Sequence, residues 1–99
     1  MHSIEWAAGL FEGEGSMNEK RHALEMQMTD KDTMEEFVKV VGYGNLRYQE
    51  PVAGNRKALY RWCVQKPAEV RRILSAMLPY LMNRRAYKAL NILDDLELA

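Results

Sequence analysis

The sequence predicts an α+β domain in which one four-stranded antiparallel sheet carries helices on one face. Two kinds of hydrophobic spacing indicate this class. Residues 23–29 alternate between apolar and polar side chains, which is the period of a half-buried strand. Residues 67–81 place apolar side chains three and four positions apart, as a helix buried on one side does. The expected order is helix, strand, strand, helix, strand, strand, helix, with one further helix at the C-terminus.

Cap and turn residues set the boundaries of the first four elements. Ser3 has the side chain of an N-cap for the first helix, and Thr29 or Asp30 can cap the second. Gly42 ends the second helix, because glycine is common directly after helices. We therefore expect a helix ending within Trp6–Ser16, a strand over Ser16–Lys20, a tight connection at Arg21-His22, a strand over Ala23–Thr29, and a helix with apolar positions Met34, Phe37, Val38 and Val41.

The second half of the chain repeats two strands and a helix. Pro67 suits the first turn of a helix, Pro79 bends or breaks that helix near its end, and Asn83 can cap a final helix. The expected strands are Gly44–Gln49 and Ala58–Val64, joined by a turn over Pro51–Lys57. The side chains of these strands that should face the helices are those of Leu46, Tyr48, Tyr60, Trp62 and Val64.

The composition is that of one small domain without net charge. Fourteen Lys and Arg residues balance fourteen Asp and Glu residues, whereas nucleic-acid binders are usually net basic. The distribution of charge must therefore decide nucleic-acid binding, because the total does not favour it.

Cys63 is the sole cysteine, which rules out an internal disulfide and fits a reducing compartment. No signal peptide is recognisable, so we expect a cytoplasmic protein in a bacterial or bacteriophage-type context.

The stretch Trp6–Ser16, W-A-A-G-L-F-E-G-E-G-S, carries the strongest functional signal. Gly9 and Gly13 lie one helical turn apart on one face, and such a pair lets a second helix approach closely. Glu12 and Glu14 fall at the helix C-terminus, where the helix dipole disfavours negative charge. A bound metal ion would offset that cost. The alternative is a short helix that ends in a turn with solvated glutamates, which is a common arrangement.

This stretch resembles the signature of LAGLIDADG homing endonucleases, in the variant W-L-A-G-F-x-D-G-D-G-S. In register with it are Trp6, Ala8, Gly9, Gly13, Gly15 and Ser16. Ala7 stands where leucine is usual, and glutamates replace both aspartates. Two weaker segments are also similar to family stretches: L-P-Y-L-M-N-R-R-A over Leu78–Ala86 and M-T-D-K-D over Met28–Asp32. The resemblance covers essentially the whole chain and implies a single αββαββα LAGLIDADG-like domain over residues 1–99.

The resemblance also implies a metal-dependent active site at the end of the motif helix. Glu14 would be the metal carboxylate and the Gly13 carbonyl a second ligand, and such hard oxygen ligands suit Mg²⁺ or another divalent cation such as Mn²⁺. Arg84 matches a position that usually holds lysine, and it would stabilise charge on the phosphate. Asp30 matches a position where a polar side chain positions water, although a helix cap explains this residue at least as well.

The polar face of the predicted sheet would contact DNA. Gln and Arg side chains make bidentate contacts to adenine and guanine, and a β-ribbon fits the major groove. Basic residues at the hairpin tips and near the last helix would hold phosphates. The candidate DNA-binding residues are Asn18, Lys20, Arg21, Glu25, Gln27, Arg47, Gln49, Arg56, Lys57, Arg61 and Arg85. The alternative is a solvated polar face, which is common in antiparallel sheets, and for Arg85 a solvated helix end.

One copy of the signature in a chain of this size implies two chains. The homodimer interface would contain Trp6, Gly9, Leu10 and Gly13. We therefore expect a homodimeric, divalent-metal-dependent endonuclease that makes a staggered double-strand break at a pseudo-palindromic site. The balanced charge, a short first hairpin and Arg84 in a usual lysine position favour an alternative, an inactive DNA- or RNA-binding module that acts as a regulator or splicing helper. A further alternative is a dimeric protein-interaction domain that does not bind nucleic acid.

Overall fold

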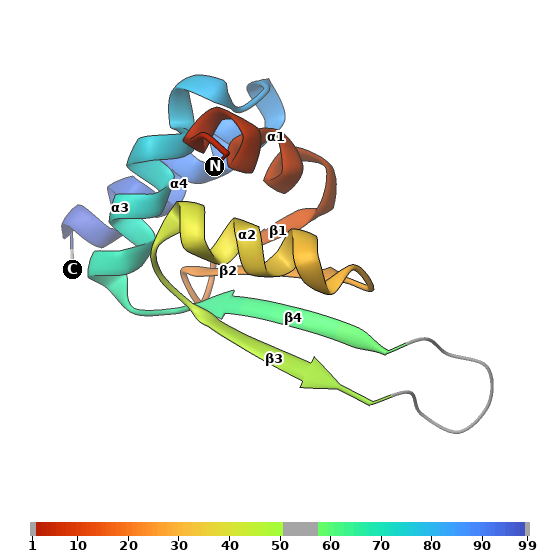
Figure 1. The fold of residues 1–99 in the computed structure, drawn as a ribbon. Coiled ribbons are helices and arrows are strands. Elements are labelled where there is room, and N and C mark those ends of the chain that lie inside the picture. Colours follow the sequence, from red (N-terminus) through yellow and green to blue (C-terminus); the bar gives the residue numbers. More distant parts are fainter. Residues whose placement is uncertain (1, 51–57, 99) are drawn as a thin grey trace.

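The fold has two layers, a sheet and a group of helices that cover one of its faces (Figure 1). The computed structural model describes residues 2–50 and 58–98. In chain order the elements are α1 (Ile4–Glu14), β1 (Gly15–Asn18), β2 (Ala23–Met28), α2 (Lys31–Val41), β3 (Asn45–Gln49), β4 (Leu59–Val64), α3 (Pro67–Met77), the 3₁₀ turn η1 (Leu78–Tyr80) and α4 (Asn83–Leu98). The predicted α+β class, element order and additional C-terminal helix are confirmed.

The sheet is antiparallel, with the strand order β1-β2-β4-β3. Directly opposite residues share a face, because side chains alternate along each strand. Trp62 lies between Met26 and Leu46 on the face that meets the helices. Arg61 lies between Gln27 and Arg47 on the opposite face. The register therefore separates an apolar face, which packs on helices, from a polar face, which is open.

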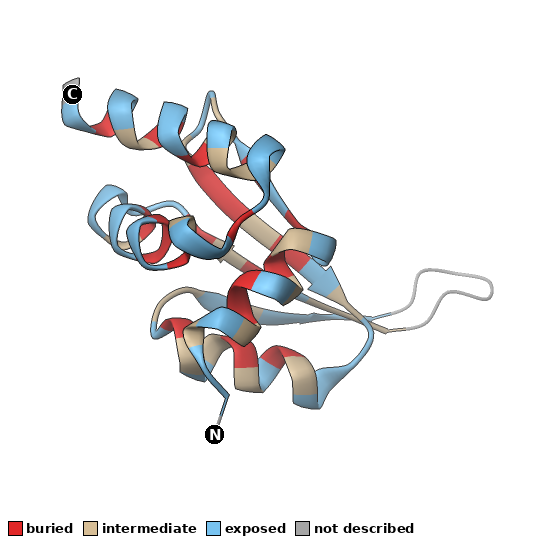
Figure 2. Cartoon of the chain, turned by 90° about the horizontal axis from the view of Figure 1, so that it is seen from above, coloured by how far each residue is buried: buried red, intermediate tan, exposed pale blue. Residues whose placement is uncertain are grey.

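Trp62 is the centre of the core between the two layers. Its side chain is fully buried, and its indole N–H donates to the Tyr43 carbonyl oxygen at 2.8 Å. Phe37 of α2 and Phe11 of α1 meet its ring edge-on, with ring centroids 4.8 and 6.2 Å away. The buried residues of the helices lie on the sides that face this core (Figure 2). One strand residue therefore joins α1 and α2 to the sheet.

The helix ends follow the expected cap chemistry. The Ser3 hydroxyl accepts a hydrogen bond from the Trp6 N–H at 3.2 Å and caps α1. Asp30, rather than Thr29, caps α2 by accepting from the Thr33 N–H at 3.3 Å. Gly42 follows α2 in the left-handed conformation, with a φ of 81°. These contacts fix where α1 starts and where α2 starts and ends.

Three details of the fold differ from the prediction. The first strand ends at Asn18, so Lys20 lies in a turn and not on the sheet. Tyr48 belongs to the inner face by register but is 55% exposed. Helix α4 includes Asn83, and Met82 occupies the position before it. The predicted turn over 51–57 lies outside the described residues.

Two glycines with positive φ give a matched test of packing. A Cβ on Gly42 would meet nothing within 4 Å, whereas a Cβ on Gly44 (φ 104°) would lie 2.2 Å from the Trp62 Nε1. Gly42→Ala should cost about 1–2 kcal/mol of unfolding free energy, from backbone strain alone. Gly44→Ala should cost a further 1–3 kcal/mol or so, from overpacking. Urea denaturation of both variants tests this, and equal losses would contradict the close packing of Gly44 on Trp62.

The cap of α2 should make stability depend on acid pH. The backbone N–H of Thr33 donates to the Asp30 carboxylate and holds the pKa of Asp30 below its ordinary value. The charged cap therefore stabilises the fold above the unfolded-state pKa of about 3.9, and this contribution is lost as pH falls through the lower folded-state pKa. The difference in unfolding free energy between the parent protein and Asp30→Ala should shrink over that acid range. A difference that stays constant with pH would contradict the cap.

Candidate active site and nucleic-acid interface

Helix α1 presents one face to the core and another to the surface. Ala7, Ala8 and Phe11 are buried, whereas Gly9 and Gly13 are exposed. A Cβ on either exposed glycine would meet no atom of the described residues within 4 Å. Glycine inside a helix costs about 0.5–1 kcal/mol relative to alanine. Packing within the described chain therefore gives no reason for glycine at positions 9 and 13.

The four predicted interface residues share this exposed side of α1. Trp6, Gly9, Leu10 and Gly13 are spaced three and four apart, which places them on one helical face. Trp6 and Leu10 are half-buried, so they flank the glycines with partly exposed apolar surface. The ring of His2 packs against Trp6, with ring centroids 4.3 Å apart. The structure thus brings the predicted interface residues together.

Glu14 is the last residue of α1, and its carboxylate is exposed. Among residues 2–50 and 58–98, no Lys, Arg or His side chain forms an ion pair with it. Gly13 belongs to the last turn of α1, where carbonyls lack partners within the helix. A carboxylate and a carbonyl that lack partners among the described residues suit Mg²⁺, which binds few protein oxygens and keeps waters and phosphate oxygens as its other ligands. The described residues contain no cluster of three His, Cys, Asp or Glu side chains that would hold a metal unaided.

Glu12, the other acid of the motif, has a different environment. Its Oε1 accepts a hydrogen bond from the Met82 N–H at 2.8 Å, and its Oε2 lies 3.3 Å from the Arg85 Nε. Arg85 also donates to the Gly15 carbonyl oxygen and lies over the Phe11 ring, 6.0 Å from its centroid. Arg85, predicted as a phosphate contact, is therefore half-buried and engaged within the chain. The sequence indicated no separate role for Glu12, because its partners Met82 and Arg85 are 70 and 73 positions away.

Arg84 and Asp30 occupy different surroundings. Arg84 is exposed in the first turn of α4, next to Arg85. The contacts of Arg85 with Glu12 and Gly15 bring this end of α4 to the C-terminal end of α1, where Glu14 lies. Asp30 is exposed and serves as the N-cap of α2. The structure therefore brings Arg84 and Glu14 to the same end of α1, and it gives Asp30 a structural role.

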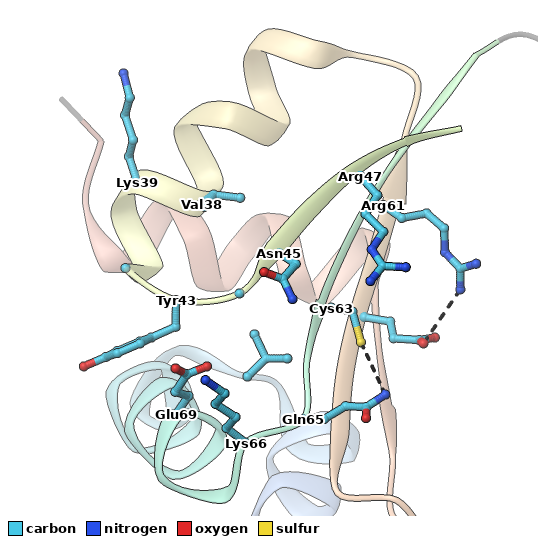
Figure 3. Close-up of a pocket in the computed structure, with 14 residues that line it drawn as sticks. Val38, Lys39, Tyr43, Asn45, Arg47, Arg61, Cys63, Gln65, Lys66 and Glu69 are labelled. Carbon is cyan, nitrogen blue, oxygen red and sulfur yellow. Dashed lines mark hydrogen bonds and ion pairs between the residues drawn. The ribbon is translucent and has the colours of Figure 1, made fainter. Parts of the chain in front are cut away.

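The open face of the sheet carries a row of polar side chains across three strands. Arg61 faces Gln27 on one side and Arg47 on the other. Arg61 also pairs with Glu25, at 3.7 Å between its Nη2 and the glutamate Oε1 (Figure 3). Two arginines directly opposite each other repel. An anionic or guanine-rich partner on this face would relieve that repulsion.

The row borders a hollow of about 860 Å³, where β3, β4 and the ends of α2 and α3 meet (Figure 3). Four basic side chains and two acidic ones line it: Lys39, Arg47, Arg61, Lys66, Glu25 and Glu69. Basic residues therefore outnumber acidic ones around this hollow, although the chain as a whole is neutral. Lys39 and Lys66 were not predicted, because neither lies on an alternating strand.

The other predicted DNA contacts are scattered. Arg21 and Gln49 are exposed, and Lys20 is exposed in the turn after β1. Asn18 is exposed, but its side-chain oxygen accepts from the Arg21 N–H at 3.1 Å, which stabilises that turn. Arg56 and Lys57 lie outside the described residues. No described helix is long and apolar enough to cross a membrane.

Comparison with known proteins gives structural but no sequence matches. No protein-family model and no curated protein matches the chain. The homing endonuclease I-CvuI, solved with the I-CreI target C1221 and 2 mM Mg with the DNA not cleaved, superposes with a TM-score of 0.75 and 18% identity over 95% of this chain. I-CvuI with its own target and Ca gives a TM-score of 0.73 and 19% identity over 95% of this chain. The homing endonuclease I-TnaI gives a TM-score of 0.69 and 15% identity over 96% of this chain.

The matched region is part of each neighbour. This chain spans 65% of the I-CvuI chain and 71% of the I-TnaI chain. Identities below 20% leave the site residues of this chain without a sequence comparison, so the likeness concerns the fold. The order of helices and strands and the four-stranded antiparallel sheet agree with the fold that the resemblance implies. The chain has the fold of the LAGLIDADG homing endonucleases.

Proposed function

We propose that this chain is a divalent-metal-dependent DNA endonuclease that works as a homodimer. The observation that carries the proposal is the construction of α1. Its buried face packs in the core, its glycine face is exposed, and its last residue, Glu14, has an exposed carboxylate. These features coincide in a fold whose solved neighbours include a homing endonuclease in complex with DNA.

Glu14 and the Gly13 carbonyl would hold Mg²⁺ or Mn²⁺ at the end of α1. The bound metal would supply an activated water and stabilise the leaving oxygen of the scissile phosphodiester. Arg84, exposed at the start of α4, would bind and orient the phosphate and stabilise its negative charge. Asp30 acts first as a helix cap, and any water that it orients would lie at the start of α2.

The exposed glycines would pack on the same helix of a second copy. Two α1 helices crossing at Gly9 and Gly13 would place both Glu14 carboxylates near the two-fold axis. Each copy would then act on one strand, and the cut would be staggered. Because the assembly is symmetric, the DNA site would be pseudo-palindromic.

The open sheet face would read the DNA. Arg61, Arg47 and Gln27 have side chains that form bidentate contacts with guanine and adenine edges in the major groove. The basic side chains around the hollow would hold the phosphate backbone. Basic residues outnumber acidic ones around the hollow beside this face, so the neutral total does not argue against binding.

A cleavage selection tests the proposed activity. The purified protein is incubated with a randomised duplex library and Mg²⁺, and the new DNA ends are sequenced. We expect staggered cuts at one pseudo-palindromic site, and at least a hundredfold less cutting with Glu14→Gln. Glu35→Gln, which neutralises an exposed glutamate of α2, is the matched control and should cut as the parent does.

Two other outcomes separate the rival functions. Enrichment of a sequence by binding without any cut would support the inactive binding module, for which Arg84 in a usual lysine position is the specific indication. Neither cutting nor salt-sensitive binding to DNA would support a protein-interaction domain. Equal cutting by Glu14→Gln and the parent would refute Glu14 as the metal ligand.

A substitution on the glycine face tests the dimer. Gly9→Leu adds a bulky side chain where two helices would meet, and it should weaken the dimer by at least tenfold, about 1.4 kcal/mol. The monomer should stay folded, because leucine is a better helix former than glycine. Sedimentation equilibrium measures the change, with Ala76→Leu on the exposed side of α3 as control. A parent protein that is monomeric at all concentrations tested would contradict the proposed assembly.

A further inference from the structure

We propose that Glu12 and Arg85 are positioning residues that hold Arg84 beside Glu14, an inference that rests on the proposed endonuclease function. The two acids of the motif would then have separate tasks. Glu14 would bind metal, and Glu12 would lock the start of α4 onto the end of α1. Arg85 would serve this lock and not the DNA phosphates.

The lock consists of three contacts across the junction between α1 and α4. Both carboxylate oxygens of Glu12 are engaged, one by the Met82 N–H at 2.8 Å and the other by the Arg85 Nε at 3.3 Å. Arg85 makes the third contact, by donating to the Gly15 carbonyl oxygen. The side chains of Glu12 and Arg85 are 28% and 25% exposed, so water competes weakly for these groups.

The contacts surround the two proposed functional residues in the sequence. Met82 and Arg85 lie on either side of Arg84, and Glu12 and Gly15 lie on either side of Glu14. Arg84 and Glu14 are themselves exposed. Fixing the neighbours therefore fixes both backbone segments and leaves the two side chains directed to the solvent. A rigid separation matters here, since a displacement of about 1 Å at a catalytic group can lower a rate by 10².

Helix electrostatics indicate that the lock serves the junction and not the individual helices. Glu12 lies in the last turn of α1, and Arg85 lies in the first turn of α4. Each charge opposes the dipole of its own helix. Each is well placed for the other helix, because Glu12 accepts from the N–H that precedes α4 and Arg85 donates to a carbonyl at the end of α1. Neither residue is therefore explained by local helix stability.

Cleavage and DNA binding are measured separately to test the proposal. The variants are Glu12→Gln, which keeps an oxygen for the Met82 N–H, Arg85→Gln, and the double variant, with Glu35→Gln as control. On a duplex recovered from the cleavage selection, each single variant should lower the single-turnover rate at least tenfold. The affinity for the duplex in EDTA should change less than threefold. The double variant should be no slower than the slower single variant, because the two residues act as a unit.

A second readout uses the metal alone and the folded protein. Mn²⁺ broadens the NMR signals of nearby amides, so in the parent protein we expect broadening of Gly13 and Gly15 and also of residues 83–86. In the Glu12 and Arg85 variants the first set should still broaden and the second should broaden less. Unchanged broadening of residues 83–86, or independent and multiplicative effects on cleavage, would overturn the lock. No broadening at Gly13 and Gly15 in the parent would instead contradict the proposed metal site.

Discussion

The packing of the Phe11 ring is the interaction on which the candidate site depends. The ring is fully buried, meets Trp62 edge-on, and lies beneath the Arg85 guanidinium. It also fills the space beside Gly15, where a Cβ would lie 2.2 Å from a ring carbon. One side chain therefore joins the core, the start of β1 and the start of α4. Glu14 lies between Phe11 and Gly15 in this arrangement, so its position is set by packing and not by its own contacts.

Local structural preferences are broken at several positions of α1 and α4, and these positions coincide with the proposed functions. Gly9 and Gly13 weaken a helix that gains nothing from them within the described chain. Glu12 and Glu14 lie at the end of a helix dipole that disfavours acids, and Arg84 and Arg85 lie where it disfavours bases. Natural sequences commonly depart from local preference where a site or an interface requires it. Elsewhere in the described chain, caps and hydrophobic periods mostly agree with the structure, and the exposed Tyr48 is an exception.

Much of the fold was predictable because local rules control it. The alternation of residues 24–27, a cap at Thr29 or Asp30, and Gly42 each act over a few positions, and the structure confirms them, although Ala23 is buried and the strand ends at Met28. Contacts between distant segments were not predictable, since no spacing rule joins Glu12 to Met82 and Arg85. The exposure of Tyr48 depends on which other elements cover that end of the sheet, and its alternating pattern does not encode this. The hollow was not predictable either, because part of its lining, including Lys39 and Lys66, comes from the ends of α2 and α3 and not from the alternating strands.

In the proposed dimer, two copies of α1 meet and place two metal sites, each with its own Glu14 carboxylate, near the two-fold axis. Anomalous diffraction from crystals grown with Mn²⁺ and a target duplex tests this claim most directly. We expect an anomalous peak within coordination distance of each Glu14 carboxylate and Gly13 carbonyl, with the two α1 helices in contact at Gly9. Peaks remote from Glu14, or copies that join through another surface, would contradict the account.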